Sequence, residues 1–258
     1  MLTCLINGKP NNLIDAKYTK DDWKKWTAKG IVTCPVCNKP YEYCHGRVRI
    51  PYFRHKDKAE CQDRYSEPET QEHLQGKIDL YDWLKTVDEV TELTLEGWLA
   101  CTKQRPDLYF RYKGEEYVIE YQCSPISSEY IERHSLYEAA GIHDIWICGT
   151  LNYFQEYHNG NGRKRVNIIE KENKIYYDIK EKKLFLVDEM SRKVFEKSNY
   201  KVIKLGQCNP FGYHYHISDE DYKGNYSRAR ASLLNMNELL TKLHLREVRN
   251  GRDQSTSV

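Results

Sequence analysis

Residues 105–122 read RPDLYFRYKGEEYVIEYQ. Two runs rich in β-branched and aromatic residues flank the pair Lys113-Gly114, which is typical of a tight hairpin turn. The pattern therefore predicts two antiparallel strands, over 107–112 and 117–123.

The register of this hairpin brings two acidic residues together. With the turn centred on the Lys-Gly pair, Tyr112 pairs with Glu115, and counting outward along the ladder places Asp107 directly opposite Glu120. Facing Cβ atoms lie about 5 Å apart, and like charges so placed destabilise a sheet. Gln122 shares the face of Glu120, because side chains repeat every second residue along a strand. A divalent cation would remove the conflict, whereas the alternative is a surface hairpin with solvated carboxylates.

The segments around the hairpin complete a mixed α/β unit. Helical spacing of apolar residues predicts helices over 68–85 and 128–140, the second ending at Gly141. Strands are expected over 87–97 and 144–148. The predicted order is helix, three strands, helix, strand.

A third acidic residue comes from the first of these helices. Glu72 lies near its start and extends the set formed by Asp107 and Glu120. Two carboxylates with further polar groups are the arrangement that holds magnesium and orients a water for in-line attack on phosphate. The alternative for Glu72 is an exposed helix charge.

The N-terminal region has the ligand spacing of a structural metal site. Cys34 and Cys37 form a CxxC followed by Asn-Lys-Pro, a tight turn that lets two thiolates face one ion. The best candidates for the second pair complete a Cys3His zinc site: Cys34, Cys37, His55 and Cys61. Cys44 and His45 lie between the pairs and are alternative ligands. A redox pair is the other interpretation, but no βαβ pattern adjoins it.

Composition limits the class of protein. The 258 residues include 40 Lys and Arg against 38 Asp and Glu, so a nucleic-acid-binding surface would have to be local. No apolar run approaches the roughly 20 residues of a membrane span, and the first residues lack the pattern of a signal peptide. We therefore expect a cytoplasmic protein without membrane association. Its nine cysteines should then be free thiols or metal ligands.

The chain is expected to divide into three parts. Residues 1–65 form the zinc-binding domain, 66–152 the catalytic core and 153–258 a C-terminal extension. In the extension we predict short strands near 166–170, 175–179 and 184–187, alternation in a strand at 213–216, and a basic helix over 227–249.

The joint order of these motifs resembles the competence protein CoiA-like nuclease family. The resemblance is carried by the cysteine and histidine motifs, Glu72-His73 with Lys77, Arg105-Pro106-Asp107, Ile119 to Ser124, Arg133 with Tyr137, and Ile145-Trp146-Ile147. It implies an α+β or α/β restriction-endonuclease-like αβββαβ core of the PD-(D/E)XK superfamily, with a zinc-ribbon-like knuckle before it and a β-strand and helix extension after it. It also implies DNA cleavage with Mg²⁺ or Mn²⁺, in bacterial transformation or anti-phage defence.

At the positions that match the family's motifs, the resemblance assigns Glu72, Asp107 and Glu120 as metal ligands. Gln122 stands where the superfamily usually has lysine, and glutamine orients water by hydrogen bonds without supplying a positive charge. Phosphate or DNA contacts are assigned to Arg133, Tyr137 and Lys77, and Arg133 and Tyr137 could instead brace Gln122. The first two have the alternative roles of a surface arginine and a packing tyrosine.

Three functions follow as hypotheses. The first is a DNA endonuclease with a structural zinc. The second is a catalytically weak nucleic-acid-binding or assembly module that retains the nuclease fold, and the third is an RNA-directed enzyme. A homo-oligomer or a protein partner is compatible with each.

Overall fold

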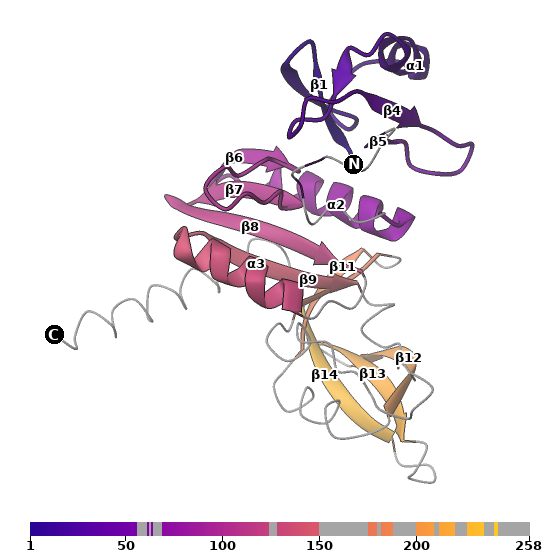
Figure 1. Cartoon of the computed structure of the whole chain (residues 1–258). Helices are drawn as coiled ribbons and strands as arrows, with labels where there is room; N and C mark the ends of the chain where they lie inside the picture. The colour runs from indigo at the N-terminus through magenta and orange to yellow at the C-terminus, as the bar shows by residue number, and fades with distance from the viewer. Residues whose placement is uncertain are drawn as a thin grey trace, which may run out of the picture. The chain divides into compact units, whose positions relative to one another are not determined.

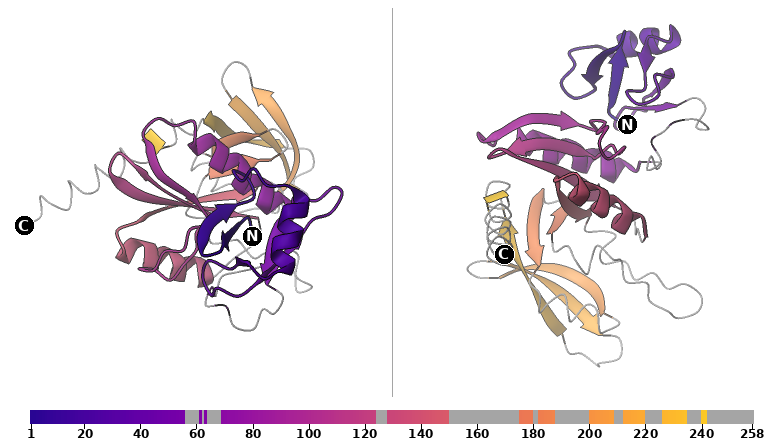
Figure 2. Two further views of the ribbon diagram at one scale, coloured as in Figure 1. Left: turned by 90° about the horizontal axis from the view of Figure 1, so that it is seen from above. Right: turned by 60° about the vertical axis from the view of Figure 1, so that its left-hand side comes forward.

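The computed structural model describes residues 1–55, 61, 63, 69–123, 128–149, 175–179, 182–187, 200–208, 212–219, 226–234 and 240–241 (Figures 1 and 2). The chain forms two compact units, one comprising 1–85, 90–121 and 128–145, the other 86–89, 122–127 and 146–258. Within the described ranges, each helix is too short or too polar to cross a membrane.

The first unit begins with a small sheet and one helix. The sheet has the order β2-β1-β3, from the strands β1 (Thr3–Ile6), β2 (Lys9–Asn12) and β3 (Val32–Thr33). Helix α1 (Lys20–Ala28) starts with a capping box, because the Thr19 hydroxyl accepts from the backbone of Asp22 while the Asp22 carboxylate accepts from that of Thr19.

An aromatic cluster supplies the core of this N-terminal region. Strands β4 (Tyr41–Cys44) and β5 (Tyr52–His55) form an antiparallel hairpin. The Phe53 ring stacks on Tyr41 at 5.8 Å between centroids and meets the edge of Trp23 at 5.3 Å. Large rings bury much apolar area per residue, so a short and polar sequence still obtains a core here.

The predicted order of helix, three strands, helix and strand is confirmed (Figure 1). The elements are α2 (Gln71–Leu84), β6 (Val90–Leu95), β7 (Leu108–Tyr112), β8 (Glu115–Gln122), α3 (Ser128–Ala139) and β9 (His143–Gly149). The spatial order is β9-β8-β7-β6, so β8 is a central strand. Thr70 caps α2 by accepting from the backbone N–H of His73 at 3.1 Å.

The hairpin of β7 and β8 has the predicted register. Tyr112 pairs with Glu115, and the ladder continues to the pair Leu108 and Ile119. Lys113 and Gly114 both have positive φ, 52° and 88°, as a type I′ turn requires. One further step along the ladder sets Asp107 opposite Glu120.

The two helices cover opposite faces of β8. On one face Gly76 of α2 lies against the Tyr121 ring, which a Cβ at residue 76 would overlap. On the other face Val118 packs with Tyr137 of α3 and Ile142. Neighbouring residues of β8 therefore point to different helices, with Glu120 on the side of α3.

The second unit contains an antiparallel set of strands in the order β12-β13-β14-β11-β10. They are β10 (Ile175–Asp178), β11 (Lys183–Val187), β12 (Tyr200–Cys208), β13 (Gly212–Asp219) and β14 (Tyr226–Leu234). The strands predicted at 175–179 and 184–187 and the alternation at 213–216 are confirmed. The strand predicted near 166–170 lies outside the described residues.

The helix predicted to start at Ser227 is wrong in its first part. Residues 226–234 form β14, in which Arg228 pairs with His216 and Arg230 with His214. The physical reason is that polar residues at 226, 228, 230 and 232 alternate with small or apolar ones, a period of two that suits a strand beside β13. Residues 240 and 241, near the end of the predicted helix, are helical.

Candidate metal and catalytic site

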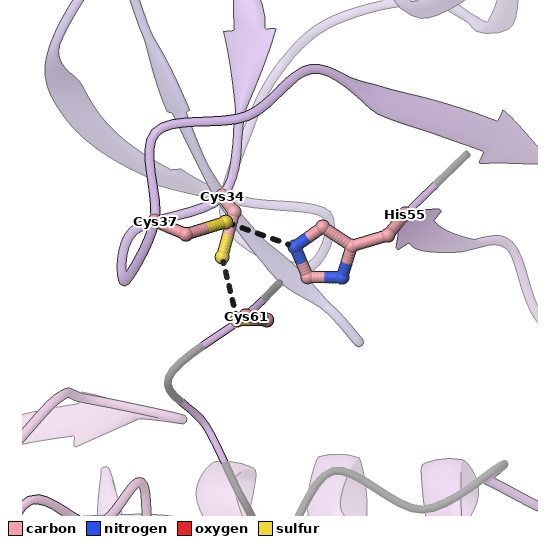
Figure 3. Close-up of side chains that lie close together, drawn as sticks. All are labelled: Cys34, Cys37, His55 and Cys61. Carbon is pink, nitrogen blue, oxygen red and sulfur yellow. Dashed lines mark hydrogen bonds between the residues drawn. The ribbon is translucent and has the colours of Figure 1, made fainter. Parts of the chain in front are cut away.

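The structure brings together the four residues predicted to hold zinc (Figure 3). Their ligand atoms all lie within 4.8 Å of one another, with 4.0 Å between the sulfur atoms of Cys34 and Cys61 and 3.3 Å between Cys37 Sγ and His55 Nε2. Zinc–sulfur bonds of about 2.3 Å at tetrahedral angles separate two sulfurs by about 3.8 Å. The group therefore fits one tetrahedral ion.

The backbone around the CxxC motif explains why these thiols converge. The Asn38 N–H donates to the Cys34 carbonyl at 2.9 Å, and Asn38 has a φ of 57°, which turns the chain sharply. The Val36 N–H also points at the Cys34 sulfur, 3.3 Å away. A backbone donor on a sulfur stabilises the thiolate that binds a metal.

The remaining members have pKa values shifted by burial. Burial lowers the pKa of His55, and so favours the neutral imidazole that acts as a ligand. Burial raises the pKa of Cys61 to about 12, so its thiolate requires a nearby cation. The alternative ligands, Cys44 and His45, lie outside this group.

A second group of possible ligands surrounds Asp107. The ligand atoms of Glu69, His73 and Asp107 lie within 4.8 Å of one another. His73 Nε2 is 3.0 Å from Asp107 Oδ2, which also accepts the backbone N–H of Tyr121 at 2.8 Å. The ammonium group of Lys77 lies 3.7 Å from the other oxygen of Asp107 and donates to Glu69.

These contacts fix the charge of Asp107. Burial alone would raise the pKa of its carboxyl, but the charges of His73 and Lys77 lower it to about 2. Conversely, Asp107 raises the pKa of His73 against the effect of burial. At neutral pH the group therefore presents an ionised carboxylate.

Glu120 has a different environment on the α3 side of β8. Its carboxylate accepts from the guanidinium of Arg133 and, at 2.6 Å, from the hydroxyl of Tyr137. Burial raises the pKa of Glu120 to about 7, with Arg133 opposing the shift and the charge of Asp107 adding to it. Glu120 is thus outside the Glu69-His73-Asp107 group but close enough to respond to the charge of Asp107.

The other residues that the resemblance assigned have the following positions. Glu72 is half-buried on α2, and its neighbour His73 is the one that contacts Asp107. Gln122 is the half-buried last residue of β8. Arg133 and Tyr137 are buried, and both donate to Glu120. Lys77 is fully buried among carboxylates, an environment that favours charge compensation over phosphate contact.

Several contacts of this region were not predicted from the sequence. Glu69 was not predicted as part of the site, although its i, i+4 and i+8 spacing with His73 and Lys77 was a signal that could have found it. No local sequence pattern indicated that Glu96 and Gln104 would be buried and bonded to these residues. Both are buried, Glu96 accepting from Lys77 at 2.5 Å and Gln104 from Arg133 Nε at 3.0 Å.

Comparisons with known proteins support the resemblance. Residues 69–215 match the family described as competence protein CoiA, nuclease-like domain. Competence protein CoiA of Bacillus subtilis (strain 168) is 35% identical over 117 residues, which cover 45% of this chain and 31% of that protein. The matched part is therefore about a third of that relative. No solved structure matches.

Proposed function

This chain belongs to the competence protein CoiA nuclease-like family, and from that premise we propose that it is a metal-dependent DNA nuclease. The proposed core is the restriction-endonuclease-like αβββαβ unit from α2 to β9. DNA is the proposed substrate and endonucleolytic cleavage the proposed reaction, during transformation or in defence against phage, in the cytoplasm.

The position of Asp107 carries the proposal. Asp107 stands at the end of β7, ionised, with the ligand atoms of Glu69 and His73 on one side and the register position of Glu120 on the other. A buried carboxylate with two further ligand groups within 4.8 Å suits a divalent cation.

The residues proposed to hold Mg²⁺ or Mn²⁺ are Asp107 and Glu120, with Glu72 as assigned by the resemblance. We add Glu69 and His73 to this set because their ligand atoms lie within 4.8 Å of that of Asp107. The carboxylates of the set suit both ions, since Mg²⁺ and Mn²⁺ take carboxylate and water ligands. The cation would polarise the scissile phosphate and make a bound water more acidic.

The chain's own groups supply the remaining chemistry. Burial raises the pKa of Glu120 to about 7 without a cation, so a cation bound to the ionised form of Glu120 would displace a proton from it near neutral pH. Arg133 and Tyr137 hold its carboxylate in place, and both bonds favour the ionised form. Gln122, two residues further along β8, is proposed to orient the attacking water.

The Cys3His group is proposed to hold a structural zinc ion. All four tetrahedral positions are supplied by side chains, so no position is open to substrate. The four ligands come from the CxxC loop, β5 and the segment after it, so one ion would join the parts of the N-terminal region.

One observation favours a second function. Gln122 stands where the superfamily usually has a catalytic lysine. The side chains of Lys77 and Arg133 are paired with carboxylates, so neither is placed to replace that lysine as a catalytic cation. A catalytically weak DNA-binding or assembly module, acting as a homo-oligomer or with a protein partner, is therefore the alternative.

Cleavage of supercoiled, linear and single-stranded DNA, with RNA as comparison, distinguishes the two. Each substrate is incubated with Mg²⁺, Mn²⁺ or chelator. The nuclease proposal predicts cleavage that needs the divalent ion and falls at least about 100-fold in Asp107→Asn, since that change removes the central ligand. Binding without cleavage, unchanged in Asp107→Asn, would support the alternative. Arg54→Gln, on an exposed pair with Glu42, is the control.

A further inference from the structure

A continuous series of buried ion pairs connects the cysteine-histidine site to Asp107. It starts beside the ligand Cys61, whose sulfur receives the backbone N–H of Asp63. The carboxylate of Asp63 lies 2.7 Å from Nη2 of Arg105. Both side chains are almost fully buried, so this contact is a tertiary link inside the first unit and not a surface pair.

Arg105 continues the series toward the acidic group. Its Nη1 lies 3.7 Å from Glu96, and Glu96 accepts from the ammonium of Lys77 at 2.5 Å. Lys77 in turn lies 3.7 Å from Asp107. Arg105 therefore contacts the carboxylates of both Asp63 and Glu96. Only Pro106 separates Arg105 from Asp107 along the chain.

Glu96 also ties the series to the first strand of the N-terminal sheet. One of its oxygens accepts from the backbone N–H groups of Leu2 and Thr3, at 2.8 and 3.1 Å, and from the Thr3 hydroxyl at 3.0 Å. The surrounding charges lower the pKa of Glu96 to about 2 although burial opposes this, so it is an anion throughout the neutral range.

The two ends of the series contact the proposed ligands directly. The Asp63 backbone N–H donates to the sulfur of Cys61, and the ammonium of Lys77 lies 3.7 Å from Asp107. Buried charges separated from water interact strongly, and displacing one member leaves its partners uncompensated.

We propose that Arg105 is a positioning residue that couples the cysteine-histidine zinc site to the acidic metal site through Asp63 and Glu96. This inference rests on the proposed function, because it takes both sites to bind metal. Zinc holds Cys61 and with it Asp63, which fixes the fork of Arg105 and, through Glu96, the ammonium of Lys77 beside Asp107. Because coupling between sites is reciprocal, disturbing Glu96 weakens zinc binding as well.

The test measures metal affinity on the full chain without DNA. Asp63→Asn removes one charge of the link, and Arg105→Lys keeps the charge but loses the fork. In both, the dissociation constant for Mn²⁺ is measured by calorimetry with zinc content held at one per chain. Both variants are expected to bind Mn²⁺ about 5- to 30-fold more weakly, which lies within the range of a typical coupling.

The reciprocal arm measures zinc release to a chromogenic chelator. Glu96→Gln, whose side chain is not a member of the cysteine-histidine group, is expected to release zinc several-fold faster than wild type. Arg54→Gln is the matched control, because Arg54 precedes the ligand His55 but forms only an exposed pair with Glu42, and it should change neither affinity.

The outcomes separate the two proposals. The coupling is overturned if the Mn²⁺ affinity of Asp63→Asn and Arg105→Lys stays within twofold of wild type. It is also overturned if Glu96→Gln releases zinc at the wild-type rate. A lower unfolding temperature with both metal affinities unchanged also overturns the coupling, since that result shows that these residues have a structural role alone. If wild type binds no Mn²⁺ and cuts no DNA, the nuclease proposal fails and the coupling fails with it. If wild type cuts DNA but the variants bind both metals as wild type does, only the coupling is overturned.

Discussion

The carboxylate of Asp107 accepts the backbone N–H of Tyr121, the residue after Glu120 on the neighbouring strand, at 2.8 Å. This bond fixes Asp107 to the strand that carries Glu120 at the point where the ladder of β7 and β8 ends. The two acids nevertheless have different pKa values, about 2 and about 7. Two carboxyl groups whose environments separate their pKa values suit different roles, here a fixed anion and a group that exchanges protons near neutral pH.

Removing the Tyr137 hydroxyl should move the pH dependence of the reaction. The hydroxyl donates to Glu120 and lowers the pKa of its carboxyl, so Tyr137→Phe raises that pKa above about 7. Because the ionised form of Glu120 is the active one, the acidic limb of the pH–rate profile should shift upward by about 0.5 to 1 unit. The rate of DNA cleavage between pH 5.5 and 9 measures it.

The control for this shift is Tyr130→Phe on the same helix. Tyr130 is also buried and stacks on His134. Tyr130→Phe should leave the acidic limb of the pH–rate profile at its wild-type position. An unshifted limb in Tyr137→Phe, or a downward shift, would contradict the role of Glu120.

Cysteine substitutions should separate ligands from bystanders. Cys61→Ser removes one of four ligands, so zinc content should fall well below one per chain and the unfolding temperature should drop, because metal binding contributes to folding. Cys44→Ser is the matched control, since Cys44 lies opposite Tyr52 in the β4–β5 hairpin and outside the ligand group. Zinc content is measured by atomic emission, and full zinc in Cys61→Ser would contradict the assignment.

Replacing Lys77 by methionine should destabilise the protein strongly. Lys77 is fully buried and contacts Glu69, Glu96 and Asp107, so its loss leaves carboxylates without their cation. Breaking a buried pair in this way costs about 3 to 5 kcal/mol, which urea unfolding measures. Lys85→Met, at the exposed end of the same helix, should cost less than about 1 kcal/mol. Equal losses in the two variants would show that the buried network contributes little.

Asp107 should also make stability depend on pH. Its folded-state pKa is about 2, below the ordinary value of 3.8, so its ionised form stabilises the fold above pH 4 and that contribution is lost as pH falls toward 2. Asp107→Asn should therefore be less stable than wild type at pH 7, by on the order of 2 kcal/mol, and the gap should close near pH 2. Urea unfolding at pH 7, 4 and 3 tests this, and a gap that widens on acidification would be the wrong sign.

Much of the fold was predictable because its signals are local. The turn at Lys113-Gly114 fixed the register by its own backbone requirements, and that register placed Asp107 opposite Glu120. The ligand spacing of the CxxC loop likewise predicted the convergence of Cys34, Cys37, His55 and Cys61. These features depend on residues within one or two elements, and a single sequence contains that information.

The rest depended on contacts between distant segments. Glu96 looks like a solvated charge after β6, yet it is buried and bonded to Lys77, Leu2 and Thr3. Whether His73 or Glu72 turns toward Asp107 depends on how α2 packs on the sheet, which follows from the close approach of Gly76 to Tyr121. The strand at 226–234 is a different case, because its alternation of polar and small or apolar residues was a local signal and its pairing partner β13 directly precedes it in the chain.

An anomalous difference map from crystals of the chain grown with Mn²⁺ tests the proposed Asp107 site. We expect a peak about 2.2 Å from an Asp107 oxygen, shared with Glu120 and with at least one of Glu69, Glu72 and His73, and separate from the zinc peak at Cys34 and Cys37. A map with the zinc peak alone, and with Asp107 still paired to His73 at saturating Mn²⁺, would contradict it.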